Sequence, residues 1–195
     1  MLKTGLSILG GVLLLALVGT AIWLYDPLPK NPDYATLAAS AANYDVEIIR
    51  DSWGVPHIYG KTNADTAFGV GYAHAEDDFE TIQDVVAATR GTLARYKGAD
   101  AAPTDYIVAL LGVWNTMDER YERDVPAEVK AIAEAYAHGV NLYAAENPDA
   151  TWAGLAPFTG EDVVAGFILK TPFFYGFDDT LKDLFAQTRD APLAT

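Results

Sequence analysis

The residues of this chain that could act in catalysis are few and form no known catalytic pattern. Its histidines are His57, His74 and His138. No two of them have the spacing of a zinc-binding HExxH helix. The chain has no cysteine, which excludes a thiolate nucleophile and cysteine-bound zinc, and none of its serines lies in a GxSxG motif. The residues alone therefore predict no complete catalytic set.

The densest group of carboxylates is "EDD" at residues 76–78. Three consecutive side chains point in different directions on a helix, so they do not form an acid–base pair by themselves. A bound cation is one interpretation. A helix boundary, or ion pairs with Arg90 or Arg95, is the interpretation that we favour.

The overall charge argues against a nucleic-acid partner. The 195 residues include 27 acidic and 13 basic side chains, which gives a net charge of −14. Phosphate binding needs a basic patch, and the sequence has none. The chain is long enough for one domain with its own core, or for one part of a larger assembly.

The N-terminus carries the strongest compositional signal. Lys3 precedes an uncharged, apolar stretch from Thr4 to Tyr25, which is long enough for a helix that crosses a bilayer. We expect residues 1–25 to be a transmembrane anchor, with a cleaved secretory signal as the alternative. Residues 26–43 read as a proline-rich spacer with a short helix at its end. Both interpretations predict that the rest of the chain is exported to the periplasm or beyond.

The elements after the spacer predict a mainly α-helical unit with a short β unit. Residues 44–51 alternate apolar and polar side chains as a strand, a turn follows at 51–54, and 55–59 resume an extended course. His57 lies in this second extended segment, where a structural role is favoured over that of a catalytic base. Helical spacing predicts two helices between Asn63 and Gly98 and further helices over residues 104–122 and 125–147. "TGED" at 159–162 is a capping box that opens a last helix, bent or broken near Pro172.

Several motifs in a fixed order resemble the α subunit of the penicillin acylase family. They are "RDSWGVPHI", "DTAFGVGYAHAEDDF", "RGTLARYKG" and "EAYAHGVNLY", within residues 44–145, followed by "PFTGEDVVAGF". The residues of the second and fourth motifs most resemble those of the aculeacin and acyl-homoserine lactone acylases. The resemblance implies an αββα N-terminal nucleophile hydrolase, of which residues 44–195 would be the α subunit.

The resemblance also implies how the chemistry is divided. A precursor of this family cuts itself into an α chain and a larger β chain, whose new N-terminal serine is the nucleophile and whose own amine is the base. No catalytic residue is then expected in this chain, and its partners are the β subunit, a small N-acyl substrate and, through its N-terminus, a membrane. "GVPHI" would be the strand and turn that hold the α chain against β.

The expected contribution of this chain is part of the acyl pocket. In the family, the helix after the "PFTGEDV" segment breaks over the active site, which corresponds here to "TPFFY". The resemblance thus marks Thr171, Phe173, Phe174 and Tyr175 as substrate-binding, while ordinary core packing is the alternative for such an aromatic cluster.

No cofactor is expected, and calcium is doubtful. The position that corresponds to the family's calcium-binding glutamate is Leu181 here, and Asp178, Asp179 and Asp183 are out of register. The lead hypothesis is an amide-hydrolysing enzyme subunit. The second is a membrane-tethered binding or scaffold protein that uses the same fold without catalysis.

Overall fold

The computed structural model describes residues 2–24 and 32–189, with side chains for residues 11–22 and 32–183, and it divides into two units, residues 1–30 and 31–195. The first unit is the helix α1 (Leu2–Leu24). The sequence predicted a membrane anchor over residues 1–25. Among the residues that the structure describes, no helix is long and apolar enough to cross a membrane, so the anchor has no support here.

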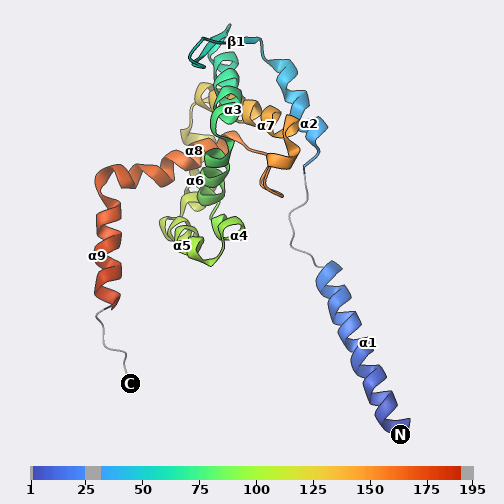
Figure 1. The fold of residues 1–195 in the computed structure, drawn as a ribbon. Coiled ribbons are helices and arrows are strands. Elements are labelled where there is room, and N and C mark those ends of the chain that lie inside the picture. The colour runs from blue at the N-terminus through green and yellow to red at the C-terminus, as the bar shows by residue number, and fades with distance from the viewer. Residues whose placement is uncertain (1, 25–31, 190–195) are drawn as a thin grey trace. The chain divides into compact units, whose positions relative to one another are not determined.

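The second unit is mostly helical with a two-stranded sheet, as the sequence predicted (Figure 1). Its elements are α2 (Tyr34–Ala39), η1 (Ser40–Asn43), β1 (Val46–Arg50), β2 (Pro56–Gly60), α3 (Asn63–Thr89), α4 (Leu93–Lys97), η2 (Ala99–Ala101), α5 (Ala102–Leu111), α6 (Val113–Asp124), α7 (Ala127–Glu146), η3 (Pro148–Ala150), α8 (Gly160–Lys170), η4 (Thr171–Tyr175) and α9 (Phe177–Arg189).

The strands β1 and β2 form an antiparallel hairpin in which Ile48 faces Ile58 and Ile49 faces His57. The Asp51 carboxylate closes the turn, because its Oδ1 accepts the backbone N–H groups of Trp53 at 2.8 Å and Val55 at 3.0 Å. The turn at 51–54 and the two strands are therefore as predicted. Pro56 opens β2 at the end of the ladder, where a missing N–H is tolerated.

The helices α3 and α7 pack backbone to backbone, and this pair is the centre of the second unit (Figure 1). A Cβ atom at Gly71 would overlap the carbonyl oxygen of Tyr136, and one at Gly139 would overlap that of Phe68. Only glycine permits so close an approach. This close packing lies along the Gly/Ala-rich part of α3, residues 69–75.

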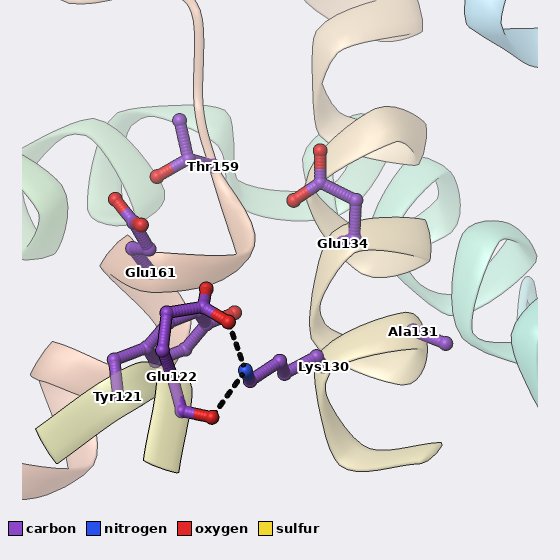
Figure 2. Close-up of a pocket in the computed structure, with 7 residues that line it drawn as sticks. All are labelled: Tyr121, Glu122, Lys130, Ala131, Glu134, Thr159 and Glu161. Atoms are coloured by element: carbon purple, nitrogen blue, oxygen red, sulfur yellow. Dashed lines mark hydrogen bonds and ion pairs between the residues drawn. The ribbon is translucent and has the colours of Figure 1, made fainter. Parts of the chain in front are cut away.

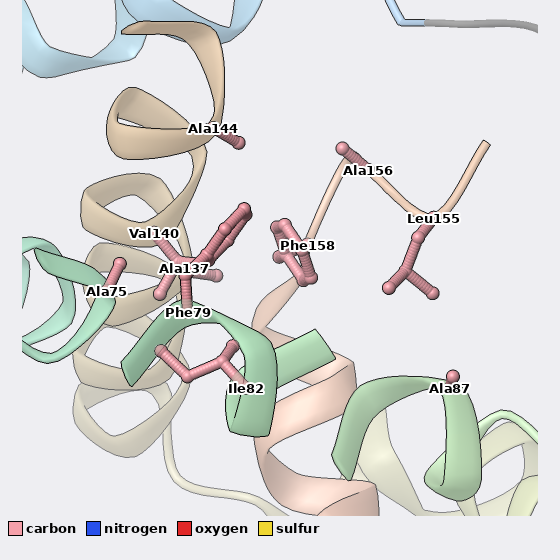
Figure 3. Packing of buried hydrophobic residues seen from close by; sticks show 10 residues of the cluster. All are labelled: Ala75, Phe79, Ile82, Ala87, Ala137, Val140, Ala144, Leu155, Ala156 and Phe158. Atoms are coloured by element: carbon pink, nitrogen blue, oxygen red, sulfur yellow. The ribbon is translucent and has the colours of Figure 1, made fainter. Parts of the chain in front are cut away.

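Two buried clusters fill the space around this pair. The larger lies between α3, α7 and the segment before α8, where the rings of Phe79 and Phe158 meet edge to face at 5.9 Å (Figure 3). The smaller joins α5, α6 and α8 through Val108, Val113, Met117, Ala165 and Leu169. The beginning of α8 is thus set by the larger cluster and its body by the smaller one.

The structure breaks two predicted helices. The expected helix over 104–122 divides into α5 and α6 at Gly112, whose φ of 61° lies in the left-handed region. Helix α3 is interrupted at Asp78, with φ −155° and ψ 62°. The break near Pro172 is as predicted, since α8 gives way there to the 3₁₀ helix η4, and Gly176 at φ 77° leads into α9.

Candidate functional site

Each histidine of the chain is used in a contact that holds the fold. His57 lies on the hairpin with its Nε2 3.4 Å from Asp51 Oδ2. His74 Nδ1 lies 2.6 Å from the Tyr136 hydroxyl, and His138 Nδ1 lies 2.7 Å from the Tyr44 hydroxyl. Among the side chains that the structure describes, no hydrogen bond joins a serine to a histidine. The hydroxyl groups that do lie on histidines belong to Tyr44 and Tyr136.

The acidic cluster at residues 76–78 is explained by an arginine that sequence reasoning did not choose. Arg50 Nη2 lies 2.9 Å from both Glu76 Oε2 and Asp77 Oδ1, so the expected partners Arg90 and Arg95 were wrong. Asp78 leaves the helical conformation, and its Oδ1 accepts the N–H of Thr81 at 3.3 Å. The helix boundary that we favoured is confirmed as this break within α3.

The start of α8 is held by Arg90 from the end of α3. Its Nε and Nη2 donate to Oδ1 and Oδ2 of Asp162, both at 2.7 Å, and its guanidinium also donates to the carbonyls of Leu155 and Pro157. Asp162 is also the capping-box residue predicted with Thr159. A bidentate ion pair of this kind fixes both the distance and the angle between the guanidinium and the carboxylate, so it sets the direction in which α8 leaves the core.

A second contact to α8 comes from α7 and borders an open cleft of about 490 Å³ (Figure 2). Glu134 Oε2 accepts the backbone N–H of Gly160, the first residue of α8, at 3.0 Å. Lys130, which lines the same cleft, forms an ion pair with Glu122, whose Oε2 lies 2.7 Å from the Lys130 Nζ. Sequence reasoning did not find Glu134 and gave Arg90 the wrong partner, because only the packing of α7 and α3 against α8 brings the two side chains there.

The four residues predicted to bind substrate follow α8 directly, in η4. Their aromatic members are exposed to different degrees: Phe173 to 36%, Phe174 to 83% and Tyr175 to 86%. The Thr171 hydroxyl donates to the carbonyl of Phe167 at 2.6 Å, so it is turned back onto α8. Within the described residues, Phe174 and Tyr175 therefore lie outside both buried clusters.

The doubtful calcium position is apolar. Leu181 is buried, and the neighbouring Asp178 and Asp179 lie 3.1 Å and 3.0 Å from the ammonium group of Lys182. No group of three or more His, Cys, Asp or Glu side chains within the described residues could hold a metal ion. Leu181 itself therefore supplies no side-chain oxygen for calcium.

Comparison with known proteins agrees with the resemblance seen in the motifs. The chain is 33% identical over 130 residues to an acyl-homoserine lactone acylase, QuiP, from Pseudomonas fluorescens strain Pf-5, which is 66% of this chain and 16% of that protein. It is 32% identical over 114 residues to the penicillin acylase 2 proenzyme of Pseudomonas sp. strain SE83, which is 58% of this chain and 15% of that protein. The chain thus spans about a sixth of these relatives.

The fold has a counterpart among solved structures. A chain of the thermostable penicillin G acylase from Alcaligenes faecalis superposes with a TM-score of 0.52 at 26% identity, covering 64% of this chain and 71% of that one. The penicillin amidase family model matches residues 45–187, which include the hairpin, the α3–α7 pair, α8 and η4. The chain belongs to the penicillin amidase family.

Proposed function

We propose that this chain is the small, non-nucleophile chain of a two-chain acylase, which cleaves an N-acyl amide into a carboxylic acid and an amine. Family membership and the acylase relatives support the reaction class. The resemblance implies that another chain supplies the nucleophile. An N-terminal serine would suit that role, because its free amine has a pKa near neutrality and acts as its own base.

The lengths of the similar proteins support the division into two chains. The region shared with this chain makes up 71% of the solved penicillin G acylase chain but only 15–16% of the curated relatives. That solved chain is therefore several times shorter than those relatives, one of which is named a proenzyme. This chain corresponds to the short partner in such an arrangement.

We further propose that Phe173, Phe174 and Tyr175 form part of the wall that contacts the acyl group. The observation that carries this proposal is the exposure of Phe174 at 83% and Tyr175 at 86% directly after a firmly held helix. Large aromatic side chains exposed side by side are costly unless a ligand or another chain covers them, and they provide a dry surface for an apolar acyl group.

Intact-mass analysis of the purified, active enzyme tests the division of roles. We expect two chains, a smaller one that contains the described core of this sequence and a larger one with a serine at its N-terminus. Full hydrolytic activity from this chain without a partner would contradict the proposal.

Replacing Phe174 by Ala tests the acyl wall. We expect long or bulky acyl groups to keep their efficiency while short ones lose contact area, so that relative kcat/KM changes by about ten- to a hundredfold, or roughly 1–3 kcal/mol. The matched control is Tyr106→Ala, because Tyr106 is also exposed, at 62%, but lies on α5. A uniform loss across the acyl series, or an equal effect of Tyr106→Ala, would refute the assignment.

The location is proposed on the N-terminal sequence alone. Lys3 followed by an apolar stretch favours export of the catalytic body. Subcellular fractionation of the activity checks this, and activity confined to the cytoplasm would contradict it.

A further inference from the structure

Three side chains form a continuous relay from the beginning of the hairpin to the beginning of α8. The Tyr44 hydroxyl lies 2.7 Å from His138 Nδ1. His138 Nε2 lies 3.2 Å from Glu134 Oε1 on the same helix, and Glu134 Oε2 accepts the N–H of Gly160 at 3.0 Å. The relay joins segments that are more than a hundred residues apart in sequence.

One assignment of protons satisfies every member of the relay. With His138 neutral and protonated on Nε2, its N–H donates to Glu134 while its Nδ1 accepts the proton of Tyr44. The pKa of Tyr44 is raised, mainly by burial and then by the negative charges of Glu134 and Asp65. Its hydroxyl therefore stays protonated and can donate. Tyr44 is itself fixed, because its ring stacks on Phe68 with centroids 4.5 Å apart.

The end of the relay meets α8 at a point of close approach. A Cβ atom at Gly160 would lie 2.8 Å from the backbone nitrogen of Glu134 and 2.9 Å from its Oε2. A helix N-terminus also carries unsatisfied N–H groups and a partial positive charge, both of which favour a carboxylate there. Glu134 therefore holds α8 at a set distance from α7, while Arg90 holds Asp162 in the same first turn of α8.

We propose that Glu134 is a positioning residue of the acylase, which fixes the start of α8 and thereby the place of the aromatic segment 173–175 at its far end. The inference rests on the proposed function, because it assumes that this segment contacts the acyl group. Glu134 touches no substrate in this role. It acts through α8, and the His138–Tyr44 part of the relay orients its carboxylate.

The test compares three variants of the whole enzyme. Glu134→Ala removes the acceptor of the Gly160 N–H. Glu134→Gln keeps a carbonyl oxygen for Gly160 and an amide that can donate to His138 once the imidazole changes tautomer, so it serves as the conservative rescue. Glu122→Ala is the matched control, because its carboxylate borders the same cleft but is bonded to Lys130 of α7, and no hydrogen bond joins it to α8 among the described residues.

Two measurements are made on each variant: amide hydrogen exchange across residues 160–170, and kcat and KM for a series of acyl lengths. For Glu134→Ala we expect exchange at Gly160 to rise about tenfold and KM for long acyl groups to rise about tenfold with kcat nearly unchanged, the size of effect that the loss of one charge-assisted hydrogen bond produces. Glu134→Gln should restore both values, and Glu122→Ala should change neither.

The outcomes separate the two proposals. Unchanged exchange at Gly160 in Glu134→Ala, or a fall in kcat at constant KM as partial unfolding would cause, overturns the positioning role. If Phe174→Ala alters acyl selectivity but Glu134→Ala does not, only the positioning role fails. If Phe174→Ala has no effect on selectivity while exchange at Gly160 still rises in Glu134→Ala, the hold on α8 stands and the acyl wall is refuted.

Discussion

Replacing Arg90 by Met is expected to destabilise the protein far more than removing an equally short ion pair on its surface. Arg90 contacts both carboxylate oxygens of Asp162 at 2.7 Å, and the side chains are exposed to 24% and 2%. Arg123 also contacts Asp124 at 2.7 Å, but those side chains are exposed to 68% and 36%. The two pairs therefore share a distance and differ in burial.

The magnitude follows from what Asp162 loses. In Arg90→Met, the Oδ2 atom of Asp162 would still accept the N–H and the hydroxyl of Thr159, at 2.8 Å and 3.0 Å. The Oδ1 atom would lose its hydrogen bond from Arg90 Nε, and no other donor among the described residues bonds to it. A carboxylate left buried after its partner is removed costs about 3–5 kcal/mol, and the surviving contacts to Thr159 place Arg90→Met near the lower end. For a unit of this size, about 3 kcal/mol lowers Tm by roughly 6–12 °C.

Scanning calorimetry of four proteins checks the reasoning: the unchanged protein, Arg90→Met, Asp162→Asn and the double variant. The double variant should be more stable than the sum of the single effects predicts, because a neutral amide needs no cationic partner. Arg123→Met is the control and should leave Tm unchanged, since exposed ion pairs are screened by water. Equal shifts for Arg90→Met and Arg123→Met, or simple additivity in the cycle, would refute the argument.

Two further predictions concern the α3–α7 pair, and a third concerns α8. Burial raises the pKa of Tyr136 to about 12, so its neutral phenol adds stability that is fully present below pH of about 10 and is lost as the pH rises through 12. Tyr136→Phe should therefore flatten the fall of Tm between pH 10 and 12 relative to the unchanged protein, and parallel curves would disprove this. Gly71→Ala should cost about 1–3 kcal/mol, because the added Cβ overlaps the Tyr136 carbonyl. Gly166→Ala, whose Cβ would meet only Thr89 Oγ1 at 3.9 Å, should stabilise α8 by up to about 1 kcal/mol, and equal Tm values for the two alanine variants would contradict the packing argument.

Local chemistry was enough to predict the elements and several of their ends. The capping box of Thr159 and Asp162, the hairpin around residues 51–54 and the break near Pro172 each depend on a few neighbouring residues, and each is present in the structure. The division at Gly112 was not predicted, and the break at Asp78 was expected only as a helix boundary within the acidic residues 76–78. A glycine or an aspartate within a helical pattern is compatible with either a continuous or a broken helix, and the packing of distant segments decides between them.

The sequence by itself determined the family of this protein, because ordered motifs remain recognisable where the overall identity is low. Its lack of cysteine and its few serines and histidines also argued against a complete catalytic set. Only the tertiary structure decided which charges meet: Arg50 with Glu76, Arg90 with Asp162, and Glu134 with the start of α8. It also decided that Phe174 and Tyr175 face outward rather than into the described core. The reason is physical. A helical pattern fixes which side chains share a face, whereas the partner of a charge and the burial of a ring depend on which helices pack against that face.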